Sequence, residues 1–329
     1  MTAMRTCVRI VLVVLALVWP GLGQQSSPGG SAQNQTPTFR KNVNLVNVFF
    51  TVKDHHGALI PDLTKEHFDV VEEGHPQTIK YFSAESNLPL TLGIMIDSSQ
   101  SMERMLPEEK IVAADFLRKV LTDKDLAFVI SFDISVDLLQ DLTSDLRLLR
   151  GGLEKARINV GTGGGGFPGI GQGPIPISHP KGTLLYDAIY LGADEMLGKQ
   201  VGRKAMIILT DGVDQGSQYK LKDALEAAQK ADVICYVLLL FDPRYGSDMS
   251  DMSHLAEQTG GRAISVGNPN KLDKAFAEIS NELRSQYSLG YTPTNEKHDG
   301  TFRKIEVKSK DGYKVQARKG YYAPSDAIR

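Results

Sequence analysis

Residues 91–101 have the sequence TLGIMIDSSQS, an apolar run that ends in an aspartate and a set of serines. The apolar part, residues 91–97, predicts a strand buried on both faces, because such strands contain few polar side chains. Asp97, Ser99 and Ser101 follow one another at positions i, i+2 and i+4. We therefore expect a cluster of oxygen-bearing side chains where this strand ends.

The chain around this segment, from about residue 90 to residue 284, alternates predicted strands and helices. Further strands are predicted at 126–132, 136–142, 204–210, 233–240 and 262–266. Helices are predicted at 105–121, 144–156, 184–197, 221–231, 250–259 and 272–284. This alternation predicts a doubly wound, Rossmann-like α/β domain with a mostly parallel sheet and helices on both faces. Cys235 lies in one of the apolar strands, so we expect a buried and unreactive thiol.

Two of the predicted helices show which side chains should face the core. In the helix at 105–121, apolar residues recur at helical spacing, namely Ile111, Ala114, Phe116, Leu117 and Val120. In the helix at 144–156, Ser144 is the expected N-cap, and Leu146, Leu149 and Leu153 are expected to point inward.

The flanks of the α/β segment differ from it, because they contain short alternating strands. These are predicted at 44–52, 68–72 and 78–82 before the segment, and at 287–291, 303–308 and 313–318 after it. Two or three strands cannot bury a face without a partner layer. We therefore expect residues 41–88 and 286–323 to form one small β-sandwich, into which the α/β domain (89–285) is inserted, with a tail at 324–329.

The N-terminus has the pattern of a secretory signal peptide. Arg5 and Arg9 precede or border an apolar run at 10–18, and small residues precede Gln24. We predict cleavage after residue 23, a flexible linker at 24–40, and a secreted or periplasmic product. The apolar run is about half of the roughly 20 residues that a membrane-spanning helix needs, and no other stretch is long and apolar enough to span a membrane.

The overall charge gives no reason to expect nucleic-acid binding. The chain has 37 Lys and Arg against 39 Asp and Glu, a formal net charge of -2, so bulk electrostatic attraction to phosphate is absent. A glycine-rich stretch at 161–173 contains a GxGxxG pattern, but no strand precedes it and no helix opens behind it. We expect a flexible loop there, close to the strand-end cluster.

Two other segments are expected to reach the same edge of the sheet as Asp97. Ligands of open α/β sheets bind beyond the carboxyl ends of the strands. Thr183 lies at the start of a predicted helix, and Asp211 directly follows the strand at 204–210. The resulting donors are all hard oxygens, with no His or Cys among them, and such a set favours Mg²⁺, or else Mn²⁺ or Ca²⁺.

This constellation resembles the metal-ion-dependent adhesion site (MIDAS) of von Willebrand factor type A (VWA) domains. The family pattern is D-x-S-x-S, then a threonine, then an aspartate, and it is matched here by Asp97, Ser99, Ser101, Thr183 and Asp211. The resemblance covers about residues 90–284. It implies that the two serines, and often the threonine, touch the metal directly, while the aspartates act directly or through water. It also implies a protein partner that offers an acidic side chain to the metal.

The whole chain also resembles the secreted bacterial VWFA-related family that is best represented in acidobacteria. The likeness lies in the flanks, in TVKDHHGALIPDLTKEHFDVVEEGHPQTIKYFS before the domain and in LRSQYSLGYTP, DGTFRKIEVK and ARKGYYAP after it. It supports the sandwich topology and implies no activity.

The function predicted from these features is binding and not catalysis. Two alternatives remain, a metal-independent structural or assembly module and a metal-assisted hydrolase; the latter lacks a second carboxylate ligand or a paired base near the ion. Asp133, Asp187 and Asp214 are either outer groups of the site or ordinary surface acids and caps.

Overall fold

The computed structural model describes residues 45–84, 88–158, 182–240, 249–268 and 271–326. All of them belong to one compact unit, Val43–Arg329. The predicted signal peptide and linker (1–40) and the glycine-rich stretch (161–173) lie outside the described residues. Within the described part, no helix combines the length and the apolar character needed to cross a membrane.

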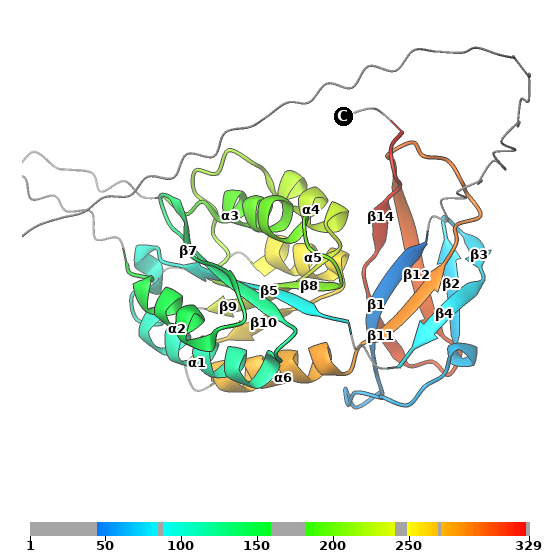
Figure 1. The fold of residues 1–329 in the computed structure, drawn as a ribbon, viewed down its shortest axis with the longest axis horizontal. Coiled ribbons are helices and arrows are strands. Elements are labelled where there is room, and N and C mark those ends of the chain that lie inside the picture. The colour runs from blue at the N-terminus through cyan, green and yellow to red at the C-terminus, as the bar shows by residue number, and fades with distance from the viewer. Residues whose placement is uncertain (1–44, 85–87, 159–181, 241–248, 269–270, 327–329) are drawn as a thin grey trace, which may run out of the picture. The chain divides into compact units, whose positions relative to one another are not determined.

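The α/β part is built on a six-stranded sheet with the order β10-β9-β8-β5-β6-β7 (Figure 1). Its strands are β5 (Leu90–Asp97), β6 (Leu126–Phe132), β7 (Val136–Thr143), β8 (Arg203–Thr210), β9 (Val233–Leu240) and β10 (Ala263–Val266). All neighbours pair in parallel except β6 and β7, which are antiparallel. Strands β5 and β9 are buried along their whole length, as expected of central strands covered on both faces.

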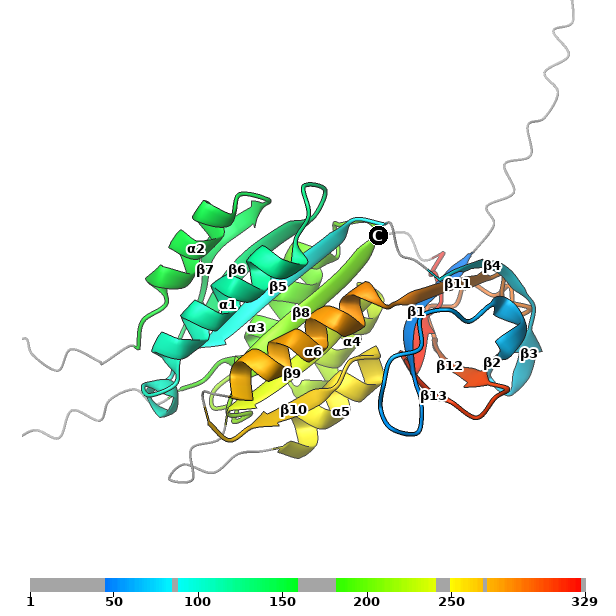
Figure 2. The same cartoon turned by 90° about the horizontal axis from the view of Figure 1, so that it is seen from below.

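Helices cover both faces of this sheet, as Figures 1 and 2 show. One face carries α1 (Leu106–Val120), α2 (Leu146–Lys155) and α6 (Leu272–Arg284). The other carries α3 (Leu185–Leu191), which continues as a π-helix (Gly192–Leu197), α4 (Leu221–Lys230) and α5 (Met249–Thr259). Helix α5 is followed directly by Gly260, whose φ of 88° is the left-handed conformation that glycine adopts easily. This arrangement confirms the predicted doubly wound α/β fold.

The structure corrects three details of the helix predictions. Ile111 is 62% exposed and does not face the core; the buried stripe of α1 runs one residue away, through Val112 and Ala113. Helix α2 is capped by Asp145 and not by Ser144, because the Asp145 carboxylate accepts a hydrogen bond from the Arg147 amide at 2.8 Å. Leu146, expected inside, is 38% exposed at the first position of α2.

The flanks form two four-stranded sheets that each contain strands from both ends of the chain. One sheet has the order β13-β1-β11-β4 and the other β14-β12-β2-β3. The strands are β1 (Val46–Lys53), β2 (Phe68–Glu72), β3 (His75–Gln77), β4 (Ile79–Ser83), β11 (Tyr287–Tyr291), β12 (Phe302–Ser309), β13 (Lys314–Ala317) and β14 (Gly320–Tyr322). Antiparallel pairing of β1 with β11 and of β2 with β12 joins the two flanks, and both sheets contribute to one apolar core.

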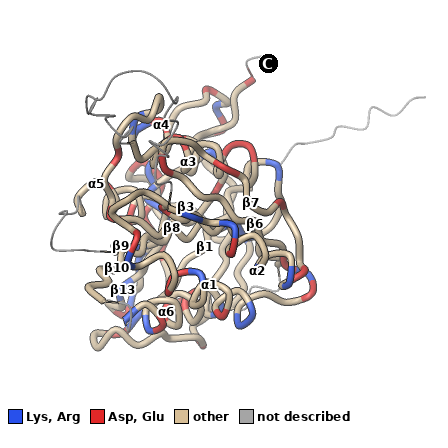
Figure 3. Tube along the Cα trace, turned by 90° about the vertical axis from the view of Figure 1, so that its left-hand side faces the viewer, with Lys and Arg blue, Asp and Glu red and all other residues tan. Residues whose placement is uncertain are grey.

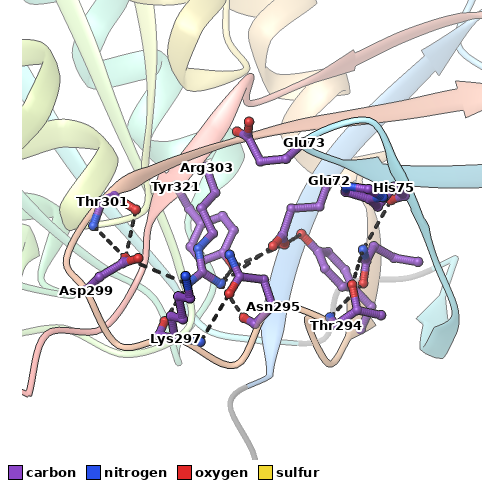
Figure 4. Close-up of polar contacts among 12 residues, drawn as sticks. Glu72, Glu73, His75, Thr294, Asn295, Lys297, Asp299, Thr301, Arg303 and Tyr321 are labelled. Atoms are coloured by element: carbon purple, nitrogen blue, oxygen red, sulfur yellow. Dashed lines mark hydrogen bonds and ion pairs between the residues drawn. The ribbon is translucent and has the colours of Figure 1, made fainter.

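A buried ion pair lies inside this sandwich (Figure 4). Arg303 of β12 and Glu72 of β2 are 3% and 2% exposed, and their Nη1 and Oε1 atoms are 3.6 Å apart. Glu72 Oε2 also accepts hydrogen bonds from the Tyr291 hydroxyl at 2.7 Å and the Tyr321 hydroxyl at 3.1 Å. Arg303 donates to the carbonyl oxygens of Asn295, at 2.6 Å, and Lys297. The network therefore ties the β11–β12 connection to the sandwich interior.

Figure 3 views the molecule from the left-hand side of Figure 1, and acidic and basic positions are intermixed along the described trace in this view. The mixture agrees with the near-neutral total charge. Any partner is therefore expected to be recognised through particular side chains and not through a broad field of one sign.

Candidate metal centre

The loop that leaves β5 is folded around the carboxylate of Asp97. This side chain is fully buried at the last position of β5. Its Oδ1 accepts a hydrogen bond from the Ser99 amide at 3.0 Å, and its Oδ2 accepts one from the Thr210 hydroxyl at 2.7 Å. The first bond curls the loop back on itself, and the second joins β5 to the end of the neighbouring strand β8.

The same loop brings two serine hydroxyls together. Ser99 Oγ and Ser101 Oγ are 3.0 Å apart, whereas the hydroxyl of Ser98, between them, donates to Phe132 O and Asp133 Oδ2, both at 3.3 Å. The side chains of Ser99 and Ser101 therefore lie together beside Asp97, as the i, i+2, i+4 spacing predicts.

Asp211 joins this group from the end of β8. It is 5% exposed, and its Oδ1 accepts a hydrogen bond from the Val213 amide at 3.1 Å. Burial above all, and then the charge of Asp211, raises the pKa of Asp97 to about 7. The Asp211 side chain is thus close enough to oppose ionisation of Asp97.

Thr183 is held at this edge through its backbone. Its amide donates to Gln215 O and its carbonyl accepts from the Gln215 amide, both at 2.9 Å. The next amide, that of Leu184, donates to Asp133 O at 2.8 Å. Thr183 is 7% exposed and is therefore fixed between the loops that follow β6 and β8.

Three further acids organise these loops. Asp133 is 7% exposed and accepts hydrogen bonds from the Ser98 hydroxyl and the Ser135 amide. Asp187 accepts from the Tyr219 amide at 2.9 Å, and Asp214 accepts from the Tyr186 amide at 3.2 Å. Asp214 thus caps the first turn of α3, Asp187 holds the segment before α4, and Asp133 supports the loop that contains the serines.

The sequence analysis missed one residue beside this group, Glu109 of α1. Its side chain is fully buried, and neither carboxyl oxygen has a hydrogen-bond partner among the described residues. Burial, and then the charge of Asp97, raises the pKa of Glu109 well above its usual value. Its position gave a usable signal, because this glutamate lies within a helical stripe whose other members are apolar. The buried stripe consists of Leu106, Glu109, Val112, Ala113, Phe116, Leu117 and Val120.

The donors at this edge fit a hard divalent cation. Asp97, Asp211 and Glu109 are buried, and no ion pair recorded in the described ranges joins any of them to a Lys or Arg. In the same ranges, no group of three or more His, Cys, Asp or Glu side chains could hold a metal ion, so a site here requires the hydroxyls. Asp97, Ser99, Ser101, Thr183 and Asp211 would hold the ion, and oxygen donors of this kind suit Mg²⁺.

The fold and this edge together define a doubly wound α/β domain with a candidate cation site at the carboxyl ends of β5 and β8. No protein-family model matches the sequence, and no curated protein matches it. The fold class follows from the strand order and the helix layers of the chain itself.

Several solved structures are similar to the chain at low sequence identity. Proximal thread matrix protein 1 from the mussel byssus is 15% identical over 73% of this chain and 50% of its own length, with a TM-score of 0.47. BatB from Bacteroides thetaiotaomicron is 19% identical over 59% of this chain and 97% of its own length, with a TM-score of 0.45. A von Willebrand factor type A protein from Catenulispora acidiphila is 11% identical over 88% of this chain and 76% of its own length, with a TM-score of 0.47. The chain thus spans about half of the mussel protein.

The raised pKa of Asp97 predicts that the metal-free protein loses stability as the pH rises. A carboxyl group whose folded pKa exceeds its unfolded value stabilises the fold fully below the unfolded value, near 4, and this contribution is lost as the pH rises through about 7. Asp97→Asn removes the ionisation. In EDTA, the free energy of unfolding from urea titration should rise for the variant relative to wild type between pH 5 and pH 8, by about 2–3 kcal/mol. A difference that does not change with pH would refute this prediction.

Proposed function

We propose that this chain is an extracytoplasmic VWA-type binding protein that holds a divalent cation, with Mg²⁺ expected and Mn²⁺ or Ca²⁺ as alternatives. The cation would bind an acidic side chain of a protein partner. The chain would therefore act in adhesion or another protein–protein interaction, and not as an enzyme.

The observation that carries the proposal is the pairing of two hydroxyls with buried carboxyl groups that have no basic partner among the described residues. Ser99 Oγ and Ser101 Oγ lie 3.0 Å apart beside Asp97. Burial, and then the charge of Asp211, raises the pKa of Asp97 to about 7. A divalent cation would relieve the repulsion between the two acids, because an opposite charge favours the ionised form of each carboxyl group.

The chemistry of the donors supports a carboxylate-bearing partner. Hydroxyl ligands are neutral, so they leave much of the ion's charge uncompensated and able to attract an anionic group. A depression of about 570 Å³ opens next to this edge, and its lining includes Ser98 and Asp133 as well as Lys155 and Arg157. The two basic side chains are exposed and would attract acidic groups on the same partner.

A binding role is preferred to catalysis because of which groups the serines contact. The Ser98 hydroxyl donates to the Phe132 carbonyl and to Asp133, and the Ser99 hydroxyl contacts that of Ser101. Among the described residues at this edge, no serine is therefore paired with a histidine. A hydrolytic nucleophile would need such a base. The extracytoplasmic location rests on the signal-peptide pattern of residues 1–23.

The proposal predicts that partner capture depends on the cation. Immobilised chain should retain a partner from native envelope extract in Mg²⁺ and release it in EDTA, and Asp97→Ala should retain none in either condition. Asp123→Ala, which removes an exposed acid, is the matched control and should behave as wild type. Capture that persists in EDTA would favour a metal-independent assembly module instead.

A further inference from the structure

Helix α1 buries a carboxyl group that the packing of the fold does not need. Glu109 is 0% exposed and belongs to the same helix face as Val112 and Phe116, which lie in the core between α1 and the sheet. An unpartnered polar group in such a place costs about 1–3 kcal/mol or more. A leucine would fill the stripe without this cost, so the carboxylate points to a role other than packing.

The surroundings of Glu109 connect it to the candidate metal centre. Its carboxyl group lies within the electrostatic range of Asp97, and Asp97 in turn lies within that of Asp211. The three acids thus form a buried series, and the ion pairs recorded in the described segments supply no Lys or Arg to any of them. Such an excess of buried acid is expected where a cation binds.

Glu109 does not lie where it could be a direct ligand alongside the two aspartates. The described residues contain no cluster of three or more acidic, His or Cys side chains arranged to hold an ion. Mg²⁺ in proteins keeps several of its waters, and the hydrogens of those waters need acceptors. Both oxygens of Glu109 are available for this purpose.

We propose that Glu109 is a positioning residue of the metal centre, which accepts hydrogen bonds from water bound to the cation and adds a third negative charge outside its direct ligands. This inference rests on the proposed function, because it presupposes that the edge of the sheet binds a divalent cation. It explains why a glutamate occupies the apolar stripe of α1, and it makes this helix part of the site.

The test compares Mn²⁺ binding by four forms of the full chain, each freed of metal with EDTA and titrated by calorimetry. Glu109→Gln keeps the shape of the side chain and removes its charge, and it should weaken Mn²⁺ binding by about 10- to 100-fold. Its thermal midpoint without metal should not fall below that of wild type, because no hydrogen bond to a described residue is lost. Glu108→Gln, on the adjacent and partly exposed residue, removes the same charge and should bind as wild type. Glu109→Leu continues the apolar stripe and should lose affinity at least as strongly.

The outcomes separate this inference from the proposed function. If wild type binds Mn²⁺ and both Glu109 variants bind it within twofold of wild type, the inference is wrong while the metal centre stands. A Glu109→Gln variant that is less stable without metal but binds Mn²⁺ normally would show a structural role and would also overturn the inference. If wild type binds no Mn²⁺, the proposed function fails and the inference fails with it.

Discussion

Replacing Arg303 by methionine is expected to destabilise the fold by about 3–5 kcal/mol, because it leaves the Glu72 carboxylate buried without its charged partner. The two tyrosine hydroxyls that bond to Glu72 cannot neutralise its charge. The bonds from Arg303 to the Asn295 and Lys297 carbonyls are lost as well. The free energy of unfolding from urea titration measures the effect.

Two further variants make the Arg303 result specific. The double variant Glu72→Gln, Arg303→Met removes both charges and should be clearly more stable than Arg303→Met alone. Lys308→Met breaks an exposed pair with Glu306 on the same strand and should change stability by less than about 1 kcal/mol. A single Arg303→Met variant as stable as wild type would mean that the buried pair does not hold the sandwich together.

The second large effect is expected on metal binding when both motif hydroxyls are removed. The double variant Ser99→Ala, Ser101→Ala takes away the two oxygens that lie 3.0 Å apart. Loss of a group outside the direct ligands already costs about 10- to 100-fold in affinity, so the loss of two direct donors should exceed that range. Calorimetric titration with Mg²⁺ and Mn²⁺ measures the loss.

Ser98→Ala is the matched control for this double variant. Its hydroxyl lies between the other two in sequence but bonds to Phe132 O and Asp133 Oδ2. We expect the metal affinity of this variant to stay within about threefold of wild type. Equal losses from Ser98→Ala and from the double variant would argue against a site built on alternate residues of the motif.

The α/β fold could be predicted because its central strands are unusual segments of sequence. The middle of β5, the middle of β8 and the whole of β9 are runs of apolar residues, and a parallel sheet covered on both faces is the structure that buries such strands. The pairing of the two flanks also followed from the sequence, since three strands at either end could not bury a face alone. Strand β14 was missed because Gly320–Tyr322 is too short for an alternation to be visible.

The candidate site could be predicted in part for a related physical reason. Parallel strands end at one edge, so Asp97 and Asp211, which follow neighbouring strands, had to lie near one another. Glu109 could not be found this way, because it lies within a helix and is separated from the motif by a turn of chain. The prediction that Ile111 faces the core also concealed Glu109, because it placed the buried face of the helix on a side that does not include Glu109.

The measurement that tests the central claim most directly is an anomalous difference map from a crystal of the chain soaked in MnCl₂. We predict one strong manganese peak at the edge of the sheet, within direct bonding distance of Ser99 Oγ and Ser101 Oγ and adjacent to Thr183, Asp97 and Asp211. The same soak of Asp97→Ala should show no peak there. A wild-type map without density at this edge, or with manganese bound only elsewhere, would contradict the account.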